Sequence, residues 1–135
     1  MPLYLLDTNI LSDVIRNPHG ACSERMQSEP AGSLCTSILV AAELRFGIAK
    51  KGAPKLTRRV DQLLDALNVL PLALGADSHY ANLRCELERH GMPIGANDML
   101  IAAHALALEA ILVTDNTAEF ARVANLKIQN WLRPG

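Results

Sequence analysis

Two aspartates each come directly after a short apolar run. Asp7 follows residues 3–6, and Asp115 follows residues 110–114. If both runs are strands of a parallel sheet, their carboxyl ends lie at one edge of the sheet, where ligands bind in open α/β proteins. We therefore expect the two carboxylates to face one crevice. Capping of the following helix is the alternative role for each aspartate.

Two more acidic residues lie on apolar faces of expected helices. Asp98 opens the most apolar segment of the chain, and its face continues with Ile101 and Ala105. Glu43 shares a stripe with Val40. Burying an unpaired charge is costly, so a structural role explains Glu43 poorly. For Asp98, a purely stabilising role at the helix amino terminus stays open.

Four converging carboxylates would repel one another unless a cation binds between them. Two charges about 4 Å apart cost about 1 kcal/mol in water and roughly 4 kcal/mol at an effective dielectric constant of about 20. Oxygen ligands alone favour a hard ion such as Mg²⁺ or Mn²⁺. We expect Asp7, Asp98 and Asp115 to bind this ion and Glu43 to complete the catalytic set. The corresponding chemistry is metal-dependent hydrolysis of a phosphodiester bond.

The elements that position these residues alternate between strands and helices. Such alternation predicts an α/β fold with a central parallel sheet of four to five strands, covered by crossover helices. We expect one domain over residues 1–135. Asn97 is expected to cap the helix that begins at residue 98, Ile128 to end a last edge strand, and residues 131–135 to form a tail. The expected strands are residues 3–6, 34–37, 68–72 and 110–114, and the expected helices are residues 9–15, 37–50, 56–67, 76–90 and 98–107.

Composition narrows the class of protein. Half of the 135 residues are apolar but only 4% are aromatic, which favours an aliphatic core of helices on a sheet over an all-β sandwich. The net charge of -1 means that any attraction to nucleic acid is local. Cys22, Cys35 and Cys85 are expected to be buried thiols in a reducing compartment. No signal-peptide pattern and no apolar run of about 18 residues is present, so we expect a cytoplasmic protein without membrane contact.

Four segments together resemble a known family. These segments are residues 6–9, residues 42–47, residues 95–105 and residues 113–116, in family order across nearly the whole chain. They resemble the PIN-domain ribonucleases and, within them, the VapC-type toxins of bacterial toxin–antitoxin pairs. The resemblance implies a three-layer α/β/α sandwich, a divalent metal ion and endonucleolytic cleavage of RNA, with tRNA a frequent substrate. Asp7, Glu43, Asp98 and Asp115 fall on the family's acidic positions.

The resemblance also implies partners. A VapB-like antitoxin is expected to bind the chain, block its active site and help it repress its own operon, so that operator DNA is contacted only through the antitoxin. VapC-like proteins usually pair through their helices, so we expect a homodimer, to which residues 56–67 are one candidate contribution.

Several polar neighbours of the carboxylates are candidates for supporting roles. Thr8, Thr114 and Asn116 are placed to orient the carboxylates or metal-bound water by hydrogen bonds, and ordinary turn chemistry explains them equally well. Glu119 lies one helical turn beyond Asp115. It either acts on the metal through water or is a surface residue.

A basic strip lies beside the expected Glu43 helix. Residues 45–59 hold six lysines and arginines and no acidic residue. Arg45, Lys50 and Lys51 are therefore candidates for holding RNA phosphates next to the metal. The alternative is a solvated helix end.

Rival functions fit the residues less well. A phosphotransferase of the haloacid dehalogenase type needs a second aspartate two positions after Asp7, where the chain has Asn9. A receiver-like binding module needs an adjacent acidic pair and a late lysine, which are not seen. A PIN-like scaffold without catalysis would not require the intact acidic positions.

Overall fold

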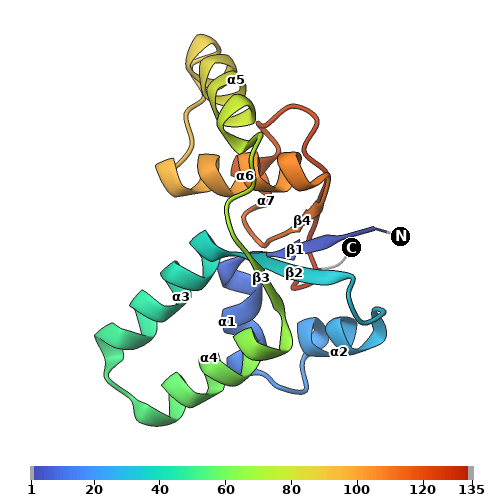
Figure 1. Ribbon diagram of the computed structural model, residues 1–135, viewed down its shortest axis with the longest axis vertical. Coiled ribbons are helices and arrows are strands. Elements are labelled where there is room, and N and C mark those ends of the chain that lie inside the picture. The colour runs from blue at the N-terminus through green and yellow to red at the C-terminus, as the bar shows by residue number, and fades with distance from the viewer. Residues whose placement is uncertain (1, 134–135) are drawn as a thin grey trace.

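Residues 2–133 are described by the structure, a computed structural model. A five-stranded sheet lies between two layers of helices (Figure 1). The strand order is β3-β2-β1-β4-β5, and every neighbouring pair is parallel. The strands are β1 (Tyr4–Leu6), β2 (Leu34–Ser37), β3 (Asn68–Leu70), β4 (Ile111–Val113) and β5 (Ile128–Gln129).

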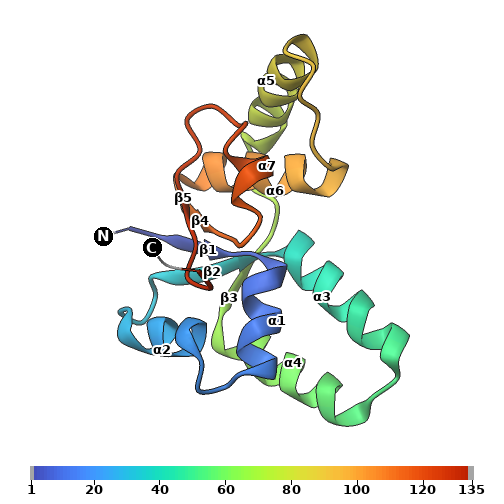
Figure 2. The same cartoon turned by 180° about the vertical axis from the view of Figure 1, so that it is seen from behind.

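The helices divide between the two faces of the sheet, as the two opposite views show (Figures 1 and 2). One layer holds α1 (Thr8–Arg16), α2 (Ala21–Ser28), α3 (Ile38–Lys51) and α4 (Pro54–Ala66). The other holds α5 (Ala76–Arg89), α6 (Ala96–Leu108) and α7 (Thr117–Phe120). The expected three-layer α/β/α architecture with a parallel sheet is confirmed.

Covered faces explain why the inner strands are apolar throughout. Leu5 and Leu6 of β1 and Leu112 and Val113 of β4 are fully buried, and Leu5 pairs with Leu112 in the parallel register. A strand that helices cover on both sides has no solvent-facing positions and therefore shows no polar alternation. The edge strands β3 and β5 are only partly buried. The described core is thus centred on β1, at whose carboxyl end Asp7 lies.

Two helices are absent from the sequence-based prediction. In α2 only Cys22 and Ser23 are buried, so the segment lacks the apolar stripe that indicates a helix. The four-residue α7 is too short to show a period. The expected cap at Asn97 is wrong, because α6 begins at Ala96 after an extended Gly95, which places Asp98 in its first turn.

The carboxyl-terminal residues are packed more tightly than expected. Trp131 is buried, lies edge to face against Tyr4 and has the Arg25 guanidinium over its ring, so the expectation of a simple tail is wrong there. Residues 134–135 of that expected tail lie outside the described part.

Cys22 and Cys35 are buried as expected. Cys85 is exposed, because α5 turns Leu83 and Leu87 inward and Cys85 lies on the opposite face.

The α3–α4 arm extends beyond the sheet (Figure 2). Gly52, with φ of 63°, ends α3 in the left-handed conformation that glycine adopts without strain, and Pro54 then starts α4.

Across residues 2–133, no helix has the length and apolar character needed to cross a membrane.

Candidate active site

Asp7 is held rigidly where β1 meets α1. Its side chain is 4% exposed and accepts hydrogen bonds at 2.8 Å from the Thr8 backbone N–H and from the Thr114 hydroxyl. The Asn9 side-chain amide donates a third, longer bond at 3.5 Å. Asp7 is also the amino-terminal cap of α1. The capping role and the site role that the sequence left as alternatives therefore coexist in one residue.

Burial dominates the electrostatics of Asp7. Removal from water raises the pKa of this carboxyl, although the bonds from Thr114, Thr8 and Asn9 lower it in part. These donors favour the ionised form, and they fix the orientation of the carboxylate.

Glu43 projects from α3 toward Asp7. Its pKa is raised by burial and by the negative charge of Asp7. One buried oxygen, Oε1, has no hydrogen-bond partner within the described residues, and neither has the Oγ1 of Thr8. The Thr8 hydroxyl lies near enough to Glu43 to lower its pKa, but without hydrogen-bond geometry. Buried polar oxygens without partners are rare and indicate a missing partner such as an ion or water.

Asp98 and Glu119 form the other side of the group. The pKa of Asp98 is raised to about 7, chiefly by burial and then by a hydrogen bond with Glu119 and by the charge of Asp7. The negative charges of Glu119 and Glu43 act in the same direction. The side-chain amide of Asn116 donates to Glu119 and, at 3.5 Å, to Asp98. Four carboxyl groups, from the cap of α1 and from α3, α6 and α7, thus share one electrostatic environment.

Asp115 is turned away from this group. Its Oδ1 accepts hydrogen bonds at 3.0 Å from Asn130 and from Arg133. The Asn130 bond and the positive Arg133 hold the pKa of Asp115 below its usual range. The expected convergence of Asp7, Glu43 and Asp98 is present in the structure, whereas Asp115 lies with the carboxyl-terminal segment and Glu119 takes the fourth place.

Asn9 is a residue that sequence reasoning missed. Its amide nitrogen donates to Asp7 and, at 3.3 Å, to Thr114, while its oxygen accepts the Asp115 N–H at 2.9 Å. Asn9 therefore joins the ends of β1 and β4. Its spacing of two residues from Asp7, in the first turn of α1, was the available signal.

The donor set fits a hard divalent cation. The oxygens belong to carboxylates that repel one another, and Oε1 of Glu43 is buried with no partner from residues 2–133. Asp7, Glu43, Asp98 and Glu119 are the residues that would hold such an ion. Among residues 2–133, no three carboxylate, imidazole or thiol groups are already gathered closely enough to ligate one ion. Binding would therefore require side-chain adjustment.

The expected RNA-binding residues lie along the α3–α4 arm. Lys50 and Lys51 are exposed in the last turn of α3, and the Lys50 ammonium lies 5.3 Å from the centre of the exposed Phe46 ring. Arg45 is paired at 2.6 Å with Asp61 of α4. Arg45 is therefore already neutralised, which leaves the two lysines as the stronger candidates for phosphate contacts.

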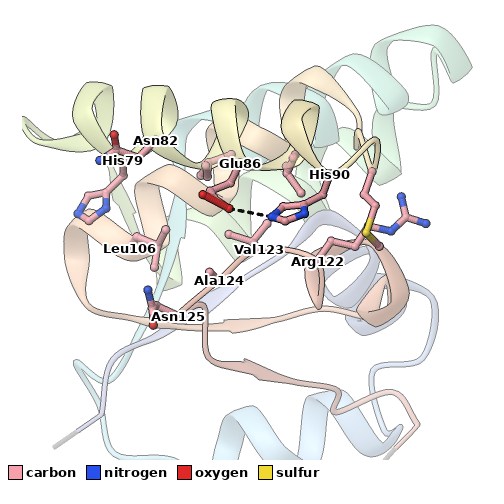
Figure 3. A pocket seen from close by; sticks show the side chains of 12 residues that line it. His79, Asn82, Glu86, His90, Leu106, Arg122, Val123, Ala124 and Asn125 are labelled. Atoms are coloured by element: carbon pink, nitrogen blue, oxygen red, sulfur yellow. Dashed lines mark hydrogen bonds and ion pairs between the residues drawn. The ribbon is translucent and has the colours of Figure 1, made fainter.

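A separate cavity of about 490 Å³ lies between α5, α6 and residues 122–125 (Figure 3). His79, Glu86, His90 and Arg122 are among its lining residues, and His90 bonds to Glu86 at 3.2 Å. None of the four clustered carboxyl groups lines it. The cavity is therefore a different feature from the carboxylate group.

Comparison with known proteins agrees with this geometry. A profile of the PIN domain matches residues 4–126. Ribonuclease VapC2 of Rickettsia felis is 37% identical over 96% of this chain and 98% of its own length. The tRNA(fMet)-specific endonuclease VapC of Shigella flexneri is 35% identical over 95% of this chain and 97% of its own.

A solved structure has a similar fold along nearly the whole chain. One chain in the crystal structure of DNA-bound VapBC from Salmonella typhimurium superposes with a TM-score of 0.90 and is 32% identical. The match covers 97% of this chain and 99% of that chain. The similarity in sequence and in fold thus extends over nearly the full length of both proteins.

Proposed function

This chain belongs to the PIN domain family, and on that premise we propose that it is the ribonuclease toxin of a VapBC-type toxin–antitoxin pair. It hydrolyses phosphodiester bonds of RNA. The observation that carries the activity is the group of half-buried carboxylates around the buried Asp7, because oxygen donors that repel one another suit a cation-assisted attack on phosphate.

The proposed cofactor is Mg²⁺, for which Mn²⁺ substitutes. When bound, the ion acts as a Lewis acid that neutralises charge on the phosphate. Asp7 supplies a carboxylate fixed by Thr8 and Thr114, and Glu43 supplies an oxygen that has no partner in the described part of the chain. These fixed oxygens require little reorganisation during the reaction.

Asp98 and Glu119 complete the proposed catalytic set. Asn116 bonds to both and so holds their oxygens toward each other. Asp98 binds a proton readily near neutral pH, so ligation of a cation requires this proton to leave. Asp115 is proposed to stabilise the carboxyl-terminal segment instead of binding the ion.

The proposed substrate class is tRNA. One relative carries a name that specifies a tRNA endonuclease, and at 35% identity it aligns over nearly all of this chain. Exposed Lys50 and Lys51 at the end of the Glu43 helix are suited to contact the phosphates of a folded RNA.

The proposed partner is a VapB-type antitoxin. Solved relatives include VapBC complexes, and those from Rickettsia felis and Salmonella typhimurium are bound to DNA. In this proposal the antitoxin inhibits cleavage, and contact with operator DNA is made through the antitoxin.

The activity is tested with purified protein, total RNA and isolated tRNA in Mg²⁺, in Mn²⁺ and in EDTA. We expect cleavage that requires the metal, begins with tRNA and is lost in Asp7→Asn and in Glu43→Gln. Lys127→Gln is the control, because Lys127 precedes β5 at the opposite edge of the sheet. Equal cleavage by wild type and both carboxylate variants would show a contaminant and refute the assignment.

A further inference from the structure

His104 is a buried polar residue that the proposed chemistry does not use. It lies in α6, its side chain is fully buried, and its Nδ1 is 2.8 Å from the hydroxyl oxygen of Ser37. Ser37 is also fully buried and comes directly before α3. Burying two polar side chains costs free energy unless each of their donors and acceptors has a hydrogen-bond partner. Which of the two residues donates the hydrogen bond therefore matters.

The partners of Ser37 and of the His104 ring together fix that direction. The Ser37 oxygen accepts the Leu39 N–H at 3.1 Å as the cap of α3, and its own proton has no other partner among residues 2–133. The Pro71 carbonyl beside the ring can only accept, so the proton of the neutral ring lies on the nitrogen that faces it and Nδ1 accepts the Ser37 proton. The ring proton then lies on Nε2, which faces the carbonyl of Pro71 without ideal hydrogen-bond geometry. Burial lowers the pKa of His104, which keeps this neutral form.

The two helices joined by this bond both carry active-site carboxylates. Glu43 comes six residues after Ser37, and Asp98 comes six residues before His104. Glu43 and Asp98 interact through their charges. Within residues 2–133 no other side-chain hydrogen bond connects α3 or its cap with α6.

We propose that the Ser37–His104 hydrogen bond sets the position of α3 against α6 and thereby holds Glu43 and Asp98 at their working separation. His104 is a positioning residue in this role, since it touches neither carboxylate. The inference rests on the proposed ribonuclease function. Small displacements far from the reacting atoms are known to lower rates by about a hundredfold, so one buried hydrogen bond suffices for a measurable effect.

A matched pair of substitutions tests this role. His104→Asn and His104→Leu have similar size and shape and leave a similar void, but only asparagine offers an acceptor to the Ser37 hydroxyl. We expect His104→Leu to lower kcat by about tenfold to a hundredfold with KM for RNA changed less than about twofold, and His104→Asn to recover much of the loss. Val40→Ala in α3 is the control for general loosening of the core.

A second arm links the effect to Ser37. In a Ser37→Ala background, adding His104→Leu should lower kcat by little more, because the bond is already absent. Nitrogen NMR of the wild-type protein should show His104 with a bare Nδ1 and a protonated Nε2, a measurement that needs no variant to fold.

The outcomes separate the two proposals. A wild-type protein that does not cleave RNA overturns the proposed function, while the NMR arm still decides the hydrogen bond. If the wild type is active, the positioning role is overturned by a His104→Leu variant as fast as Val40→Ala, or by equal rates for the leucine and asparagine variants. Additive losses with Ser37→Ala, or a protonated Nδ1, would overturn it as well.

Discussion

At the scale of single residues, each carboxylate is distinguished by the donors that surround it. Asp7 has three donors, Asp115 has Asn130 and Arg133, and Glu43 has an oxygen with none among the described residues. A carboxylate whose oxygens are already bonded to a guanidinium is a poor ligand for an ion. Our proposed set of ligands therefore follows the hydrogen-bond partners of each carboxylate and not only the presence of an acidic residue in the sequence.

The first prediction compares Glu119 with Asp115. Glu119→Gln should lower kcat by about a hundredfold, because it removes a charge next to Asp98 in a group expected to hold the ion. Asp115→Asn should stay within about threefold of wild type, because its partners lie in the carboxyl-terminal segment. Steady-state cleavage of tRNA measures both. The reverse ranking would restore Asp115 to the metal site and remove Glu119 from it.

The second prediction concerns pH. The pKa of Asp98 in the folded, metal-free protein is about 7, above the ordinary 3.8, so the folded state binds a proton more tightly than the unfolded chain. Stability therefore falls as pH rises between these two values. Without metal, the Tm of wild type should decline from pH 5 to pH 8, and Asp98→Asn should reduce that decline and raise the Tm at pH 8.

Calorimetry in EDTA checks this slope, with Asp115→Asn as the control that keeps it. An unchanged pH dependence in Asp98→Asn would assign the proton to another group. Activity has the opposite direction, since the ion competes with this proton and cleavage should increase with pH through the same range.

At the scale of elements, the strand ends set which residues meet. Thr114 continues from β4 with its hydroxyl on Asp7, and side chains of extended chain alternate in direction, so the next residue, Asp115, faces the other way. The turn that follows brings α7 back and directs Glu119 inward. Periodicity within strands and helices was readable from sequence, whereas the path of this turn was not.

The same distinction explains the rest of the prediction. The proximity of Asp7, Glu43 and Asp98 could be predicted because each lies after a buried strand or on an apolar helical stripe, which are local patterns. The helix α2 and the packing of Trp131 on Tyr4 depend on contacts between distant segments. Asn9 was overlooked because its partners, Thr114 and Asp115, are more than 100 positions away in the chain.

The third prediction belongs to the α3–α4 arm. Lys50→Gln combined with Lys51→Gln should weaken RNA binding and make the slope of log K against log salt shallower by about 0.7 for each phosphate that a lysine no longer neutralises. Arg45→Gln should change the slope less, because Arg45 is paired with Asp61. Binding to the inactive Glu43→Gln protein at several salt concentrations measures the slopes. An unchanged slope in the double lysine variant would make the arm a solvated surface, and an equal change from Arg45→Gln would mean that the Asp61 pair does not keep Arg45 from RNA.

At the scale of the whole molecule, a net charge of -1 leaves long-range attraction to RNA weak. Recognition must then come from local contacts and from the cation at the site. The layered fold suits this requirement, since the clustered carboxyl groups come from the end of β1 and from helices of both layers, α3 on one side and α6 and α7 on the other.

The fourth prediction is stabilisation by metal. At a concentration about 100 times its Kd, an ion that binds only the folded state adds about 2.7 kcal/mol, which should raise the Tm by roughly 10 °C in a protein of this size. Mn²⁺ and Mg²⁺ should therefore stabilise wild type and Lys127→Gln but not Glu43→Gln. A shift of equal size in Glu43→Gln would place the ion elsewhere.

Because Asp7 has both a structural and a proposed catalytic role, it is not the best position for making a catalytically inactive variant of this protein. The same carboxylate that serves the reaction also closes the first turn of α1 and ties it to the end of β4. Replacing it by alanine would confuse loss of turnover with loss of folding, because an amino-terminal cap alone is worth about 1 kcal/mol. Trapping an uncut RNA, or producing the toxin without harming its host, is better done through Glu43, whose free oxygen leaves the scaffold untouched.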